Sequence, residues 1–450
     1  MVAKDGGVMT TPILQGALTF PAVAVITLLV LVAWAFGAFL RRDLPRTVSV
    51  AAPVIVAIAT SATMTFFRLT NDVYLLSDEK TWHAQSISVA EYLSSGQSAT
   101  VNLSAGKEGY SWIIGTLYWI SGPAPLVPIV FGALTFILLV PICGAVTNLV
   151  ARDLRLSDVA ATKAVRWACY FVALCPAIVI WVPRMLRESI SMLLIGLMIL
   201  WFLKYLEARR PMLLIGVGLM AAVMVTIRAQ VGMGIIAGIV LSSIVAYSTR
   251  YRHVFSRVML VGPCFALIFA VTWAFVDSTS DLSAESIALR NRALTDASSA
   301  FDGGETAYTA DSLLEIVLFN LPRAALGPFP TELNLSGGIV IAAMSNIFWL
   351  ACILGALLLF PGLRRAEATR SQPTEKRRAR SFVVLVVLAM TLVAILSITA
   401  GNYGLVVRMR LMPLVALIPA AAIGFQVWRH RRSGDVLFRQ EAAAVPLRRV

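Results

Sequence analysis

Long apolar stretches recur along the chain from Pro12 to Trp428, and short polar segments separate them. A helix that crosses a bilayer needs about 20 mainly apolar residues. The pattern therefore predicts about eleven transmembrane helices, at residues 16–40, 47–68, 124–150, 163–182, 188–206, 211–227, 229–248, 257–276, 336–361, 381–400 and 411–428.

Composition supports the same fold class. Hydrophobic residues make up 58% of the 450 and charged residues 14%, with a mean hydropathy of +0.81, whereas a soluble domain carries about 25% charged residues. We expect an all-α, polytopic membrane protein with a single transmembrane domain over residues 1–428. A basic cytoplasmic tail follows at 429–450.

The basic residues predict the orientation. Of the 38 Lys and Arg residues, about 26 fall in one alternating set of connecting segments, and cytoplasmic loops carry such an excess. The N-terminus is then outside the plasma (inner) membrane and the C-terminus is cytoplasmic, with outer loops at 69–123 and 277–335 and a cytoplasmic linker at 361–380. Because the net charge of +14 lies in clusters between apolar runs, we expect membrane lipids, and no nucleic acid, as partners.

The first outer loop contains two adjacent acids, Asp78 and Glu79, just beyond the second predicted span. A carboxylate within hydrogen-bond reach of an acceptor hydroxyl can act as a general base. The alternative is that both are ordinary solvated loop acids.

Two segments of the same loop, 84–93 and 109–120, have the spacing of amphipathic helices that lie on a membrane surface. His83 precedes the first segment and Tyr110 opens the second, so both are candidate supporting residues. The three histidines are scattered along the sequence, which indicates no histidine-type metal site.

Arginines occur at three other predicted outer positions. Arg184 and Arg187 flank a tight turn that ends in Glu188. A guanidinium offers a fork of donors for phosphate or pyrophosphate, and Glu188 could orient one; the alternative is arginines that reach lipid headgroups beside a local Arg–Glu pair. Three other arginines are candidates as well. Arg228 lies between two apolar stretches, and Arg408 and Arg410 lie at the start of the last predicted span.

Five motifs follow one another along residues 47–425, all on the predicted outer side. They are Ser77-Asp78-Glu79, the stretch from Gly109-Tyr110 to Gly122, Pro183-Arg184-Met185-Leu186-Arg187-Glu188, Leu321-Pro322 with Gly327-Pro328-Phe329-Pro330, and Asn402-Tyr403-Gly404 before Arg408-Met409-Arg410. In this order they resemble the multi-span GT-C class of glycosyltransferases and the related bacterial polysaccharide polymerase-like membrane proteins.

The resemblance implies transfer of a sugar or oligosaccharide from a polyprenyl-phosphate or pyrophosphate carrier to a glycan or lipid acceptor outside the cytoplasm. An acid of the first outer loop, Asp78 or Glu79, would be the base or bind a divalent cation. The donor phosphate would be held by some of the outer arginines. The chain departs from many members of the class by an extra span before the first loop and by lacking a large C-terminal soluble domain, so transferase and polymerase both remain open.

Two other functions fit the same features. A flippase or transporter of lipid-linked oligosaccharides would carry polar residues near the centres of its spans, whereas most spans here are aliphatic. A non-catalytic subunit of an envelope glycan assembly complex would need no individual outer acid or arginine.

Overall fold

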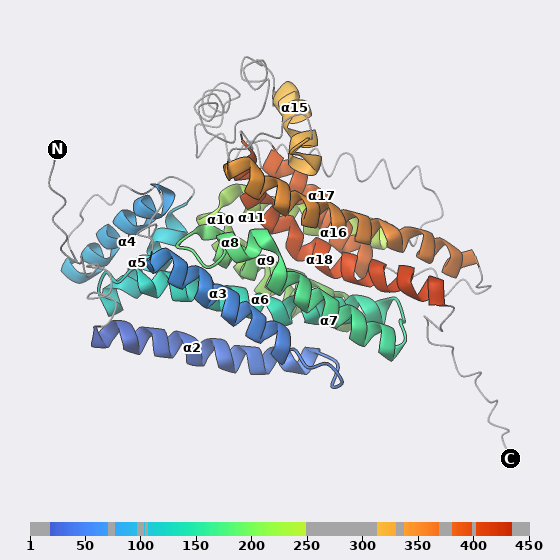
Figure 1. Ribbon diagram of the computed structural model, residues 1–450, viewed down its shortest axis with the longest axis horizontal. Helices are drawn as coiled ribbons and strands as arrows, with labels where there is room; N and C mark the ends of the chain where they lie inside the picture. Colours follow the sequence, from blue (N-terminus) through green and yellow to red (C-terminus); the bar gives the residue numbers. More distant parts are fainter. Residues whose placement is uncertain are drawn as a thin grey trace.

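The structure, a computed structural model, describes residues 19–70, 77–96, 103, 107–248, 313–329, 337–368, 380–397 and 402–433. All regular elements in these ranges are helices (Figure 1). The helices are α2 (Phe20–Leu40), η1 (Arg41–Asp43), α3 (Ala51–Thr70), α4 (Ser77–Ser95), α5 (Glu108–Ser121), α6 (Leu126–Asp153), α7 (Asp158–Leu174), α8 (Pro176–Trp181), α9 (Arg187–Ala208), α10 (Pro211–Ile227), α11 (Ala229–Ser248), α15 (Leu313–Leu326), α16 (Gly337–Ala368), α17 (Arg380–Ser397) and α18 (Tyr403–Ser433).

Length and composition identify the membrane-embedded part. Six helices of the described chain are long and apolar enough to cross a membrane: α2, α6, α9, α16, α17 and α18, while α3, α10 and α11 contain shorter apolar segments. The described part of the chain is therefore all-helical, and its apolar helices indicate a membrane-embedded protein. The total of eleven spans stays a prediction, and the span at 257–276 lies outside the described residues.

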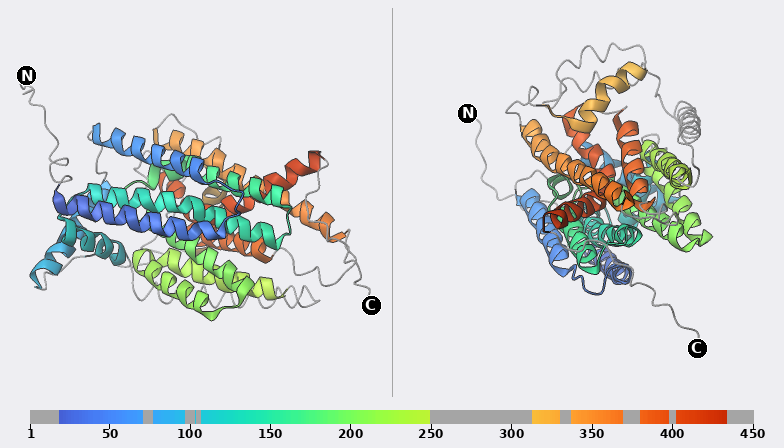
Figure 2. Two further views of the ribbon diagram at one scale, coloured as in Figure 1. Left: turned by 90° about the horizontal axis from the view of Figure 1, so that it is seen from below. Right: turned by 90° about the vertical axis from the view of Figure 1, so that its right-hand side faces the viewer.

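The buried fraction of each helix indicates whether it lies at the centre or at the edge of the bundle. Most of the apolar window of α18 is buried, whereas little of α2 is, and the end-on view shows α2 at the edge of the bundle (Figure 2). Gly424 of α18 meets Gly355 of α16 so closely that a β-carbon on Gly424 would overlap the carbonyl oxygen of Gly355. Small residues at such crossings let membrane helices approach backbone to backbone.

Three predicted bounds are wrong. The segment at 163–182 is two helices, because Pro176 has no N–H to continue the ladder of α7 and begins α8 instead. The last helix begins at Tyr403, since the Asn402 side chain accepts the amide of Leu405 at 2.8 Å and caps it. The helix predicted at 336–361 continues to Ala368, and the cytoplasmic linker at 361–380 stays a prediction.

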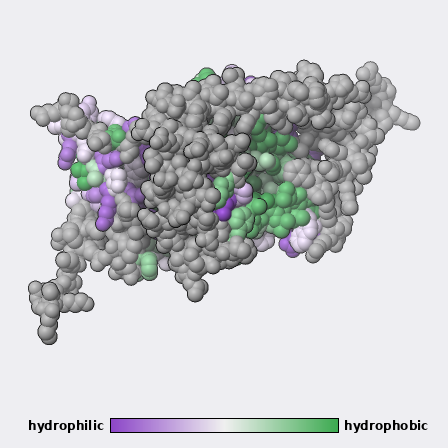
Figure 3. All heavy atoms as spheres, turned by 90° about the horizontal axis from the view of Figure 1, so that it is seen from above, coloured by the Kyte–Doolittle hydropathy of each residue, from purple (hydrophilic) through white to green (hydrophobic). Residues whose placement is uncertain are grey.

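The segment predicted to be the first outer loop contains two helices as expected, α4 and α5, which lie together at one end of the bundle (Figure 1). Whether they lie on a membrane surface stays a prediction. The N-terminal ends of α9 and α18 lie toward the same end, while the loop from α6 to α7 lies toward the opposite end (Figures 1 and 2). On the face shown in Figure 3, the described residues at the α4 end are mainly polar and those farther along are mainly apolar.

Candidate functional site

Glu188, in the first turn of α9, is the centre of a buried charge cluster. Its side chain is fully buried, and Oε1 accepts from Arg228 Nη1 at 3.3 Å and from Arg408 Nε and Nη2, each at 3.1 Å. Arg228 lies between α10 and α11, and Arg408 lies on α18. Three segments that are far apart in the sequence thus bring their charged side chains to one carboxylate.

Arg408 also reaches helix α4. Its Nη1 donates to Oδ2 of Asp78, in the first turn of α4, at 2.6 Å. The Asp78 side chain is 53% exposed, whereas Arg408 is mostly buried. One guanidinium therefore joins an exposed acid to a buried one through charge-assisted hydrogen bonds, which are the stronger kind in proteins.

Glu79 has a different place from its neighbour. It is only 1% exposed, and Oε1 accepts the backbone N–H of Met185 at 3.2 Å. Met185 belongs to the turn between α8 and α9, and Gly132 of α6 supports the other side of that turn, where a β-carbon would come within 2.9 Å of the Val182 carbonyl oxygen. Glu79 thus holds the turn that carries Arg184, while Asp78 is open to solvent.

Two tryptophans provide faces for the arginines of this turn. The Arg184 guanidinium lies 4.7 Å from the ring centre of Trp181, and Arg408 lies 5.4 Å from the same ring. Arg187 lies 4.7 Å from the ring centre of Trp82. Such cation–π contacts orient a guanidinium without using up its hydrogen-bond donors.

Two buried polar atoms of the cluster have no hydrogen-bond partner among the described residues. Arg187 donates through Nη1 to the Ile227 carbonyl at 3.4 Å, but its Nε makes no hydrogen bond, and neither does Oε2 of Glu188. Buried polar atoms are nearly always paired in folded proteins. Nε1 of Trp181 is likewise buried without a hydrogen bond to a described residue, so the site presents more than one donor, and one acceptor, that a polar molecule could use.

The predicted supporting residues lie beneath the turn. Tyr110 is buried against Trp82, with ring centres 5.7 Å apart and an edge-to-face geometry, and burial raises the pKa of Tyr110 well above its usual value. His83 Nδ1 lies 2.9 Å from the hydroxyl of Tyr118, and partial burial lowers the pKa of His83. Both residues pack beside the site and keep their rings neutral at pH 7.

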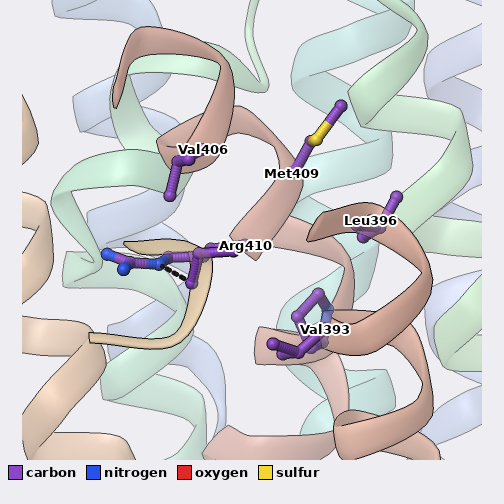
Figure 4. Close-up of a pocket in the computed structure, with 7 residues that line it drawn as sticks. Val393, Leu396, Val406, Met409 and Arg410 are labelled. Atoms are coloured by element: carbon purple, nitrogen blue, oxygen red, sulfur yellow. Dashed lines mark hydrogen bonds between the residues drawn. The ribbon is translucent and has the colours of Figure 1, made fainter. Parts of the chain in front are cut away.

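Arg410 lies elsewhere. It is buried, and its donors meet the C-terminal end of α15: Nε donates to the Ala324 carbonyl at 2.7 Å, and Nη2 to those of Gly327 at 2.6 Å and Arg323 at 3.0 Å. Nη1 donates to Oδ1 of Asn346 at 2.8 Å. Figure 4 shows the extended Arg410 side chain and, as a dashed line, one of its hydrogen bonds. The structure does not bring Arg410 to the Glu188 cluster, and its donors meet carbonyls at the end of a helix, where intrahelical partners run out.

Sequence reasoning gave no role to Trp82, Trp181 or Tyr118. Their one signal is the position of each aromatic residue beside a candidate charged residue or within a predicted amphipathic segment. No metal-holding group of three or more His, Cys, Asp and Glu side chains forms within the described ranges, and the divalent cation stays a prediction. No protein-family model, curated protein or solved structure matches the chain.

Proposed function

We propose that this protein is a membrane glycosyltransferase or polysaccharide polymerase that uses a polyprenyl-phosphate or pyrophosphate-linked donor on the outer side of the membrane. One observation carries the proposal: Arg408 joins the exposed Asp78 to the buried Glu188, which also receives Arg228. An exposed carboxylate beside several fixed guanidiniums combines a base with an anion-binding surface.

Asp78 is the base in this proposal. Because Arg408 holds Oδ2, the carboxylate is fixed in place, and Oδ1 takes the proton of an acceptor hydroxyl as that hydroxyl attacks the anomeric carbon of the donor. The bond from the anomeric carbon to the phosphate oxygen breaks, and the electron pair leaves with the phosphate. Glu79 is too deeply buried for this role and acts as a positioning residue.

The arginines stabilise the leaving group. Negative charge grows on the carrier phosphate in the transition state, and fixed guanidiniums at that point lower the barrier. Arg187 is placed to donate to the phosphate, because its Nε is buried and makes no hydrogen bond with a described residue, while Trp82 orients the group. Arg228 and Arg408 are committed to Glu188, so they contribute mainly charge.

The test compares Asp78→Asn with Glu91→Gln, a change at an exposed acid on the same helix α4. Membranes containing each variant are supplied with a panel of polyprenyl-phosphate-linked sugars, and glycan product is measured at equal protein level. Loss of a general base lowers the rate by about 10²–10⁴-fold, so Asp78→Asn should lose nearly all product and Glu91→Gln none. Unchanged product from Asp78→Asn would remove the proposed base.

A second comparison separates the base from its support. Glu79→Gln keeps an oxygen for the Met185 amide, so its activity should fall much less than that of Asp78→Asn. If all outer acid and arginine variants keep full product, the chain is a non-catalytic subunit instead. If the lipid-linked donor crosses vesicles without any glycosidic bond forming, transport is the function.

A further inference from the structure

A second polar site lies at the end of the bundle opposite α4. It is a hollow of about 700 Å³ between the segment that links α2 to α3, the C-terminal end of α6 and the start of α7. Small-molecule sites in proteins occupy about 300–1,000 Å³. Its residues do not overlap with those of the Glu188 cluster.

Arginines dominate the lining. Arg46, Arg152 and Arg155 line the hollow together with a single acid, Asp158, which leaves the lining with net positive charge. Arg152 pairs with Glu207 at 2.6 Å, but both side chains are more than half exposed, at 57% and 51%. Exposed ion pairs contribute about 0–1 kcal/mol, so the Arg152 guanidinium is free to exchange Glu207 for another anion at little cost.

The uncharged part of the wall combines polar residues with the apolar Pro45, Leu156 and Ala161, and the polar ones are held by hydrogen bonds. The hydroxyls of Thr47 and Thr162 lie 3.0 Å apart and join the α2–α3 link to α7. Asn148 of α6 donates to the carbonyl of Asp43 at 2.8 Å, and Lys204 of α9 holds the Asp43 carboxylate at 2.6 Å. The hollow therefore keeps its shape without relying on the arginine side chains.

Arg155 occupies a costly backbone conformation at the rim. It follows α6 with φ of 53°, in the left-handed region that favours glycine. The Leu156 amide bonds to the Ala151 carbonyl at 2.9 Å and the Arg155 amide to the Arg152 carbonyl at 3.0 Å, which is the helix-ending motif where glycine is usual. Arginine at this position gives up stability and places a guanidinium at the hollow.

The surroundings indicate a lipid rather than a soluble ligand. On α7, Val159 and Trp167 are exposed apolar residues next to the exposed Lys163 and Arg166. A band of apolar and aromatic side chains interleaved with basic ones is typical of a headgroup layer. We propose that this hollow binds the phosphate of an anionic membrane lipid headgroup through Arg46, Arg152 and Arg155.

The test uses two matched variants of the full chain in nanodiscs. Arg155→Gly removes the guanidinium from the hollow, and Arg209→Gly is its control, because Arg209 lies at the same end, has φ of 57° and does not line the hollow. Both variants should raise the thermal unfolding midpoint slightly, because glycine relieves the left-handed backbone. Only Arg155→Gly should weaken retention of phosphatidylglycerol in native mass spectrometry, by about tenfold for one lost charged hydrogen bond.

Two further arms identify the source of the phosphate. Phosphatidylcholine should be retained less well than phosphatidylglycerol by the unaltered chain, because its choline cation meets the arginines. Inorganic phosphate should neither displace phosphatidylglycerol nor stabilise the chain in an Arg155-dependent way. Equal loss of lipid in both glycine variants would overturn the site, and displacement by inorganic phosphate would overturn the lipid as its occupant.

Discussion

Replacing Glu188 by glutamine tests the buried charge cluster most directly. The change keeps shape and an acceptor oxygen, but it leaves Arg228 and Arg408 beside a neutral amide in a fully buried place. A hydrogen bond to a charged group contributes about 1.5–3 kcal/mol and a neutral one about 0.5–1.5 kcal/mol. Because two arginines are affected, Glu188→Gln should lower the free energy of unfolding by about 2–3 kcal/mol. Glu188→Ala should lower it by about 3–5 kcal/mol, as when one partner of a buried ion pair is removed.

The assay is reversible unfolding in mixed detergent micelles, followed by circular dichroism. Glu207→Gln is the control, because it is the same substitution on the same helix in an exposed pair with Arg152, and it should change stability by less than about 1 kcal/mol. A double-mutant cycle with Arg228→Gln isolates the pair. The charge-neutral double variant should be more stable than the sum of the single changes predicts by about 1–3 kcal/mol. Additivity within about 0.5 kcal/mol would refute the claim that these charges stabilise one another.

Three other outcomes follow from particular contacts. Arg410→Met should lower stability by about 3 kcal/mol, because it strips the carbonyls at the end of α15 of their donors, and limited proteolysis within 313–329 should accelerate. Gly132→Val should displace the turn at Val182 and lower glycan product more than about tenfold, whereas Gly218→Val, with open space around it, should change nothing. Burial lowers the pKa of His83 in the folded chain below the unfolded value of about 6.5, so the folded chain binds fewer protons than the unfolded one. The free energy of unfolding is therefore highest above a pH of about 6.5 and falls as the pH drops from there toward the folded pKa. His83→Gln should flatten this part of the dependence of stability on pH.

The helices were accessible to sequence reasoning because a bilayer-length apolar run is a strong signal. The predicted bounds are wrong where a cap, a proline or an ion pair has more influence on the helix end than the number of apolar residues. The predicted last span begins after Arg410, because charges normally mark the end of a span. In the structure, Arg408 and Arg410 both lie within α18. The cost of burying Arg408 is offset by its ion pairs with Asp78 and Glu188. The cost of burying Arg410 is offset by hydrogen bonds to backbone carbonyls. Asn402 caps the start of the helix that contains both arginines.

The site was partly accessible for a related reason. Topology can gather charged residues at one end of a bundle, and the structure brings Asp78, Glu188, Arg228 and Arg408 into contact there. Topology cannot say which way a side chain points. Residues two apart on a helix differ by about 200° around its axis, so Arg408 and Arg410 leave α18 in different directions. Adjacent residues differ by about 100°, which leaves Asp78 exposed and Glu79 buried on the same helix α4.

Arg408 joins helices that are far apart in the sequence. It lies on the most deeply buried helix of the bundle, and its partners lie on α4 and α9. Because a buried guanidinium without a counter-charge is costly, the folded position of α4 and the charge state of Glu188 depend on each other through this one residue. Asp78 is then held in place by the core of the bundle through Arg408, and the proposed base needs such a fixed position if its carboxylate is to meet a hydroxyl within about 3 Å.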